Sequence, residues 1–107
     1  MNGRSDPDDA QGVEAWNRAL EELQTAPGIG SSLGRDLLEL GVRGLSDLGD
    51  ADPEELYERH CRRCGCRVDR CVLYAFRCAV YYASHEDHDP ELLKWWSWKD
   101  RSPAAEA

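Results

Sequence analysis

Apolar residues recur at helical spacing on both sides of a short turn that contains two glycines. Before the turn they are Val13, Trp16, Leu20 and Leu23, and after it they are Leu33, Leu37 and Leu40. Spacings of three and four residues place each set on one face of a helix. The turn is Pro27-Gly28-Ile29-Gly30; Ser31 or Ser32 can cap the helix that follows, and Gly41 lies just beyond its end. This pattern predicts two amphipathic helices that meet in a hairpin, with Gly34 permitting their close approach.

A second helical hairpin is predicted further along the chain. Residues 42–49 form a connector with a short turn of helix. Asp52, Pro53 and Glu55 give a strong helix start signal, and Gly65 ends the helix that they open. No stretch has the alternating pattern of a strand. We therefore predict an all-α fold of about five helices, which form two helix-hairpin-helix units related by a pseudo-two-fold.

The second hairpin continues into a long helix from Val68 to about Ala83, which is apolar almost all round and is predicted to be central to the core. Asp89 and Pro90 then open a short helix that extends through Trp96. The tryptophan-rich segment 92–98 either clamps the end of the long helix or forms an exposed patch for a partner.

The chain of 107 residues is expected to form one domain. Residues 1–12 lack large apolar side chains and are predicted to be a disordered segment, residues 13–100 form the double helix-hairpin-helix domain, and residues 101–107 form a disordered tail. No signal peptide is visible, and the longest apolar run, Cys71 to Ala83, is too short to span a membrane. We expect a cytoplasmic protein with no membrane association.

The first hairpin turn is a candidate phosphate site. The N–H groups that begin the second helix lie where the helix dipole favours an anion, and glycine lets a ligand approach the main chain closely. The residues of this site are Gly28, Ile29, Gly30, Ser31, Ser32 and Arg35. They predict binding of a DNA phosphate without reading of the base sequence. The alternative is a compact connector whose glycines serve helix packing alone.

Charge argues partly against a nucleic-acid partner. The formal net charge is −8, whereas neutralising phosphates requires Lys and Arg. Residues 59–78 nevertheless hold six arginines against Asp69 alone. The predicted basic patch consists of Arg62, Arg63, Arg67, Arg70 and Arg77. The alternative is internal pairing with the acidic stretch from Asp47 to Glu58.

One face of the long helix alternates guanidinium and phenol groups, at Arg70, Tyr74, Arg77 and Tyr81. Such interleaving can stack on bases or hold a nucleic-acid backbone. In the structural alternative, the arginines pair with acidic neighbours and the tyrosines pack.

Four cysteines lie close together in the sequence: Cys61, Cys64, Cys66 and Cys71. Groups of four thiolates suit zinc or an iron–sulfur cluster, but a second Cys-x-x-Cys pair of the zinc-ribbon type is missing. Cysteines are also among the most commonly buried residues. We therefore predict thiols in or near the core and no cofactor.

No catalytic arrangement stands out in the sequence. The glycine turn lacks the Lys-Ser/Thr of a nucleotide-binding loop. His60 is adjacent to Cys61, and neighbouring residues on a helix point apart, so His60 is not placed to activate that thiol. We predict that the protein is not an enzyme.

Clustered motifs extend from the hairpin to the tryptophan segment. They are Pro27-Gly28-Ile29-Gly30, Leu40-Gly41-Val42-Arg43, Asp52-Pro53-Glu54-Glu55-Leu56-Tyr57, Val68-Asp69-Arg70-Cys71-Val72-Leu73-Tyr74, Phe76-Arg77-Cys78-Ala79-Val80-Tyr81-Tyr82 and Trp95-Trp96-Ser97-Trp98-Lys99-Asp100. Over residues 20–100 the chain resembles the pathogenicity-locus family of small bacterial helix-hairpin-helix proteins, some of which are labelled mitomycin-resistance proteins. The middle part is also similar to the C-terminal domain of the TfoX-like competence regulators. The resemblance implies a double helix-hairpin-helix fold and an association with DNA, and it carries no assigned activity.

These observations lead to one functional hypothesis and two alternatives. The hypothesis is a non-enzymatic module that binds DNA weakly and without sequence preference through the hairpin turn. The first alternative is a protein–protein adaptor without DNA affinity, in which the tryptophan-rich end or the basic patch contacts a protein partner. The second is a cysteine-rich domain that senses metal or redox state.

Overall fold

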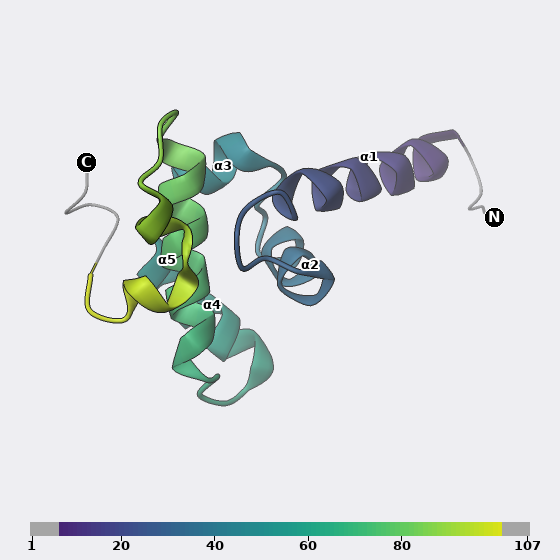
Figure 1. The fold of residues 1–107 in the computed structure, drawn as a ribbon. Helices are drawn as coiled ribbons and strands as arrows, with labels where there is room; N and C mark the ends of the chain where they lie inside the picture. Colours follow the sequence, from purple (N-terminus) through teal and green to yellow (C-terminus); the bar gives the residue numbers. More distant parts are fainter. Residues whose placement is uncertain (1–6, 102–107) are drawn as a thin grey trace.

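The structure, a computed structural model, describes residues 7–101 and, from residue 13 onward, their side chains. Every regular element in this part of the chain is helical, which confirms the all-α prediction (Figure 1). The elements are α1 (Pro7–Leu23), α2 (Ser31–Glu39), α3 (Leu45–Gly49), α4 (Pro53–Cys64), α5 (Arg70–Ser84) and two 3₁₀ turns, η1 (Pro90–Leu93) and η2 (Trp95–Trp98). The predicted pseudo-two-fold relation between α1–α2 and α4–α5 stays a prediction.

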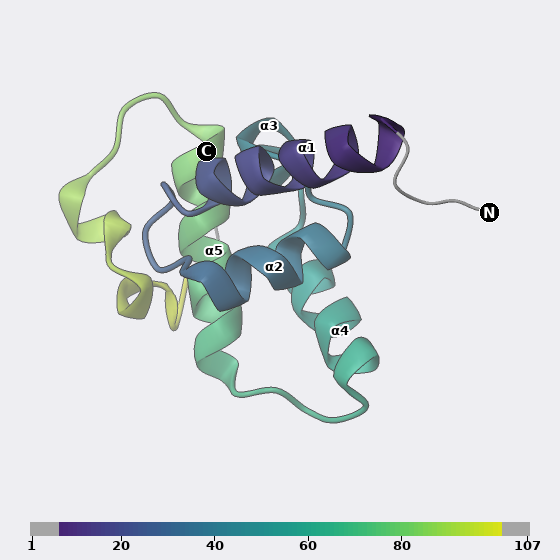
Figure 2. The same cartoon turned by 90° about the vertical axis from the view of Figure 1, so that its right-hand side faces the viewer.

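Helix α5 lies at the centre of the molecule. It packs against α3, α4 and both 3₁₀ turns, while α1 packs against α2. Figures 1 and 2 show the C-terminal segment, residues 85–101, along the side of α5 that faces away from α1 and α2. Leu73, Phe76 and Val80 of α5 are buried in the main core, so the predicted central position of this helix is confirmed.

Helices α1 and α2 lie close together because Gly34 has no side chain. A Cβ atom at Gly34 would lie 2.6 Å from Cδ1 of Leu20, so a larger residue would have to displace that leucine. The prediction that Gly34 serves close helix packing is therefore confirmed. At the other end of α2, Gly41 has a φ of +96°, and the N–H of Val42 donates to the carbonyl of Leu37 at 3.0 Å. The conformation of Gly41 and this hydrogen bond end α2 where the sequence predicts.

The boundaries of α4 also match the prediction. The Asp52 carboxylate accepts a hydrogen bond from the N–H of Glu54 at 2.9 Å, and Pro53 occupies the first helical position. Gly65 ends the helix in the left-handed conformation, with a φ of +71°. Residues with a Cβ rarely adopt this conformation, so the turn between α4 and α5 depends on glycine.

Two helix starts differ from the prediction. Helix α1 begins at Pro7, so residues 7–12, which we expected to be disordered, are helical; proline suits the first helical position even without apolar neighbours. The predicted disorder of residues 1–6 and 102–107 lies outside the described residues. Helix α2 is capped by Gly30, which has no side chain, and by neither Ser31 nor Ser32.

Two further elements differ in the second half of the chain. Helix α5 begins at Arg70 and not at Val68, because the Asp69 carboxylate accepts a hydrogen bond from the N–H of Cys71 at 3.0 Å. This bond lowers the pKa of Asp69. The single short helix predicted after Asp89 is instead the two turns η1 and η2, separated by Lys94 in an extended conformation.

A single arginine joins the C-terminal segment to the rest of the fold. The side chain of Arg77 is only 13% exposed, and its Nε lies 3.1 Å from Oε2 of Glu54 on α4. Its Nη1 donates to the backbone carbonyls of Trp98, at 2.8 Å, and Lys99, at 3.2 Å. The guanidinium also lies over the ring of Tyr74. Arg77 is therefore a structural group, and this excludes it from the predicted basic patch.

We expect Arg77→Leu to lower the free energy of unfolding by about 2 kcal/mol, because it leaves Glu54 and two carbonyls without their donor. Urea unfolding followed by circular dichroism measures this change. Arg67→Leu is the control, since its pair with Glu58 is exposed and is expected to contribute less than about 1 kcal/mol. Equal effects of the two substitutions would contradict the role of Arg77.

Candidate functional site

The hairpin turn between α1 and α2 is partly used for packing. Gly28 has a φ of +83°, and a Cβ atom there would lie 3.5 Å from Cβ of Trp95 and 3.7 Å from Cβ of Ala75. The N–H of Ile29 donates to the carbonyl of Ala26 at 3.2 Å, and the Ile29 side chain is buried. Of the predicted phosphate ligands, the N–H of Ile29 is thus already engaged, and Gly28 faces the C-terminal segment.

The start of α2 is open to solvent. The first hydrogen bond of this helix runs from the N–H of Gly34 to the carbonyl of Gly30, at 2.9 Å. Within the described part of the chain, the N–H groups of Gly30, Ser31 and Ser32 have no hydrogen-bond acceptor, and all three residues are exposed. Arg35 is exposed one turn further on. These unpaired donors at the positive end of the helix dipole can hold one anion.

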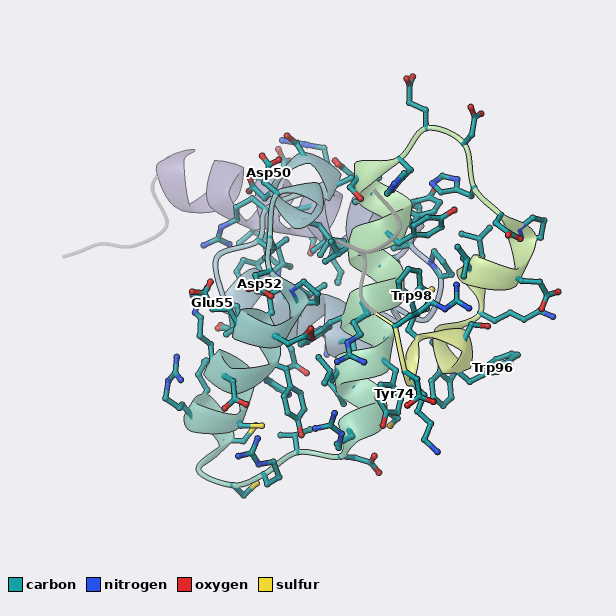
Figure 3. The ribbon with its side chains drawn as sticks, turned by 90° about the vertical axis from the view of Figure 1, so that its left-hand side faces the viewer. Asp50, Asp52, Glu55, Tyr74, Trp96 and Trp98 are labelled. Atoms are coloured by element: carbon teal, nitrogen blue, oxygen red, sulfur yellow. The ribbon has the colours of Figure 1, made fainter. Side chains whose placement is uncertain are left out.

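A small apolar pocket of about 200 Å³ lies beside this helix start. It is lined by Gly28, Leu33, Cys71, Val72, Ala75 and Trp95. Trp95 and Trp96 lie edge to face with ring centroids 5.7 Å apart, and they are 37% and 60% exposed. Trp98 is fully buried against Tyr81 and donates from Nε1 to the carbonyl of Leu92 at 2.8 Å. Trp98 therefore packs on α5, as one interpretation of the segment predicts, and Trp96 points towards solvent (Figure 3). A partner for the exposed Trp95 and Trp96 stays a prediction.

The predicted basic patch is divided by internal contacts. Arg63 lies 3.8 Å from Glu39, and Arg67 lies 3.2 Å from Glu58. Together with the Arg77–Glu54 pair, this supports pairing with the stretch from Asp47 to Glu58 for Arg67 and Arg77, whereas the partner of Arg63 lies on α2, outside that stretch. Two others, Arg62 and Arg70, are exposed and form no ion pair within the described residues.

The face with alternating arginines and tyrosines follows its structural interpretation at Arg77 and Tyr81, whereas Arg70 is exposed and has no ion pair within the described residues. The guanidiniums of Arg70 and Arg77 each lie 5.9 Å from the ring centre of Tyr74. Tyr81 is buried, and its hydroxyl accepts a hydrogen bond from the N–H of Asp89 at 2.9 Å. In Figure 3, Tyr74, Trp96 and Trp98 lie to the right of three acidic residues at the ends of α3 and α4: Asp50, Asp52 and Glu55.

The cysteines are spread over different environments. Cys61 is buried, Cys71 is half-buried, and Cys64 and Cys66 are exposed on either side of Gly65. In the described part of the chain, no three His, Cys, Asp or Glu side chains are arranged to hold a metal ion. The four predicted candidate ligands are thus not brought together as a metal site.

His60 has contacts that the sequence analysis missed. It is the buried histidine of α4, only 6% exposed, and its ring lies 3.9–4.0 Å from Sγ of Cys64. Its Nε2 lies 3.6 Å from Oδ2 of Asp36 on α2. The signal in the sequence for the contact with Cys64 is the spacing of four residues, which places both side chains on one face of α4.

The fold defines a small all-helical protein with an exposed helix start and no helix, among the described residues, long and apolar enough to cross a membrane. The family model Cdd1, described as "Pathogenicity locus", matches residues 17–103, and the chain belongs to this family. The predicted family resemblance is thereby confirmed.

The chain is 35% identical over 75 residues to a Streptomyces lavendulae protein named mitomycin resistance protein McrB, and the match covers 70% of this chain and 68% of the relative. No solved structure matches the chain significantly. The similarity to TfoX-like proteins stays a prediction.

Cys78 generates a pH prediction. Its thiol is fully buried on α5 and donates to the carbonyl of Leu92 at 3.5 Å, and burial raises its pKa from 9.0 to about 11. The unfolded chain therefore loses this proton first, and stability present below pH 9 is lost as the pH rises towards 11. We expect the urea midpoint to fall over this interval, and to fall less in Cys78→Ala. An equally steep fall in that variant would contradict the assignment.

Proposed function

We propose that this protein is a non-enzymatic module that binds DNA at the start of α2, without sequence preference. The observation that carries the proposal is the set of exposed N–H groups of Gly30, Ser31 and Ser32, which lack acceptors within the described residues. A DNA phosphate oxygen supplies the acceptor that they lack. Arg35 adds a positive charge one turn away.

The charge of the chain limits the strength of this interaction. The net charge of −8 disfavours DNA binding overall, whereas the open N–H groups at the α2 start and the exposed Arg62 and Arg70, which form no ion pair within the described residues, favour it. Few phosphate contacts mean a low affinity that falls as salt is added.

Ser31→Asp tests the site without weakening the fold. An aspartate in the first turn of α2 is expected to stabilise the helix by about 0.3–1 kcal/mol, but it occupies the anion site with a fixed negative charge. We expect DNA affinity to fall about tenfold. Fluorescence anisotropy with labelled single-stranded, duplex and branched DNA, over a salt series, measures this change.

Ser46→Asp is the matched control for this experiment. It makes the same change of charge at the exposed start of α3, away from the hairpin turn, and is expected to leave affinity nearly unchanged. Equal losses in the two variants would show only a general charge effect, and the proposed site would be wrong. Flat anisotropy of the unmodified protein at low salt would rule out DNA binding itself.

A protein partner at Trp95 and Trp96 is the second candidate function. Exposed tryptophans are enriched at protein interfaces, where they often contribute most of the affinity. We expect Trp96→Ala to abolish capture of a protein from nuclease-treated extract while DNA affinity is unchanged. The control is Trp16→Ala, which alters the half-buried tryptophan of α1. Loss of capture in both variants would contradict a specific interface at Trp96.

A further inference from the structure

Cys64, on α4, and Asp36, on α2, both lie beside the buried imidazole of His60. The Sγ of Cys64 is 4.0 Å from Nδ1 and 3.9 Å from Nε2 of His60. The same Nε2 lies 3.6 Å from Oδ2 of Asp36. A thiol beside an imidazole that is itself beside a carboxylate is the arrangement by which proteins activate cysteine nucleophiles.

The fold holds the three groups in this order. His60 and Cys64 are four residues apart on α4, so they share one face of the helix. The imidazole is fixed by burial and by the edge of Phe76, whose ring centroid is 6.2 Å away. Asp36 reaches the ring from α2, and its side chain remains 30% exposed. The thiol is at the exposed end of α4, so a small reagent can reach it from solvent.

We propose that Cys64 is the reactive thiol of this protein, activated by His60 and positioned to capture a soft carbon electrophile. When Nε2 carries the ring proton, it can donate to Asp36, and Nδ1, 4.0 Å from the sulfur, is then the proton acceptor of the ring. The imidazole takes the thiol proton, and the sulfur forms a bond to the electrophilic carbon. The bond from that carbon to its leaving group breaks, and the electron pair departs with the leaving group. The reaction occurs once per chain, as a modification and not as turnover.

Other charges near Cys64 act in both directions. The carbonyls at the end of α4 disfavour a negative sulfur, whereas the guanidiniums of Arg62 and Arg63 in the same turn favour it. Arg63 is partly neutralised by Glu39, 3.8 Å away. The imidazole is the neighbouring group that distinguishes Cys64 from the exposed Cys66.

Cys66 is a control within the same chain. It is exposed, as Cys64 is, and lies two residues further on, but within the described part of the chain it has no hydrogen bond to an imidazole. Burial raises the pKa of the thiols of Cys71 and Cys78, which makes them poor competitors. A difference in rate between Cys64 and Cys66 therefore reports the contribution of His60.

Alkylation by a limiting amount of iodoacetamide at neutral pH tests the proposal. The tryptic peptide Cys64-Gly65-Cys66-Arg67 carries both thiols, and fragment ions in mass spectrometry assign the label to each. We expect Cys64 to react about fivefold faster than Cys66, because the imidazole beside Cys64 can take the thiol proton during the reaction. Equal rates for the two thiols in the unmodified protein would overturn the proposal, whatever the variants do.

Three variants separate chemistry from structure. We expect His60→Gln to slow Cys64 to the rate of Cys66, and Asp36→Asn to slow it partly. Asp36→Glu keeps a carboxylate at this position, so we expect it to react faster than Asp36→Asn and close to the rate of the unmodified protein. A purely structural role of Asp36 would not require this difference. The rate of Cys66 is expected to stay constant in all three. An unchanged Cys64 rate in folded Asp36→Asn and His60→Gln would overturn the mechanism; if His60→Gln does not fold, the two Asp36 variants decide.

Discussion

The arrangement of this protein depends on one guanidinium group. Arg77 projects from the central helix and contacts Glu54 of α4, the ring of Tyr74, and the backbone of the C-terminal segment at Trp98 and Lys99. The carbonyls that it satisfies belong to a segment without long helices of its own, so few backbone bonds hold that segment in place. A fully charged side chain that is largely shielded from water requires this many partners, and the partners fix three parts of the fold relative to one another.

The hairpin turn and the tryptophan segment are linked through the same region. Gly28 packs on Trp95, so the turn that carries the open N–H groups of α2 is supported by the segment that Arg77 anchors. The proposed DNA site is therefore not a property of the hairpin alone. Its geometry depends on contacts made by residues at the other end of the chain.

The sequence predicted most of what depends on nearby residues. The ends of α4 were correct because Asp52, Pro53 and Gly65 act within a few positions of the boundary. The predicted start of α5 was wrong by two residues. The Asp69 carboxylate accepts a hydrogen bond from the N–H of Cys71, and the hydrophobic pattern contains no information about this bond. Contacts between distant segments were not predictable in this way. The partners of Arg77 and the approach of Asp36 to His60 depend on how α2, α4 and α5 pack, and periodicity contains no information about the facing helix.

The anchored C-terminal segment has a consequence for motion. Its attachments are a few side-chain bonds and the burial of Leu92 and Trp98, whereas the remaining core has its own cluster of buried residues. Such a segment is the part that detaches first in local unfolding, while the rest stays native. Detachment would uncover Cys78 and Tyr81 and release Trp95 from Gly28. A ligand that rigidifies the hairpin turn would therefore slow hydrogen exchange in residues 90–98. The hairpin turn and the C-terminal segment would then share one opening equilibrium.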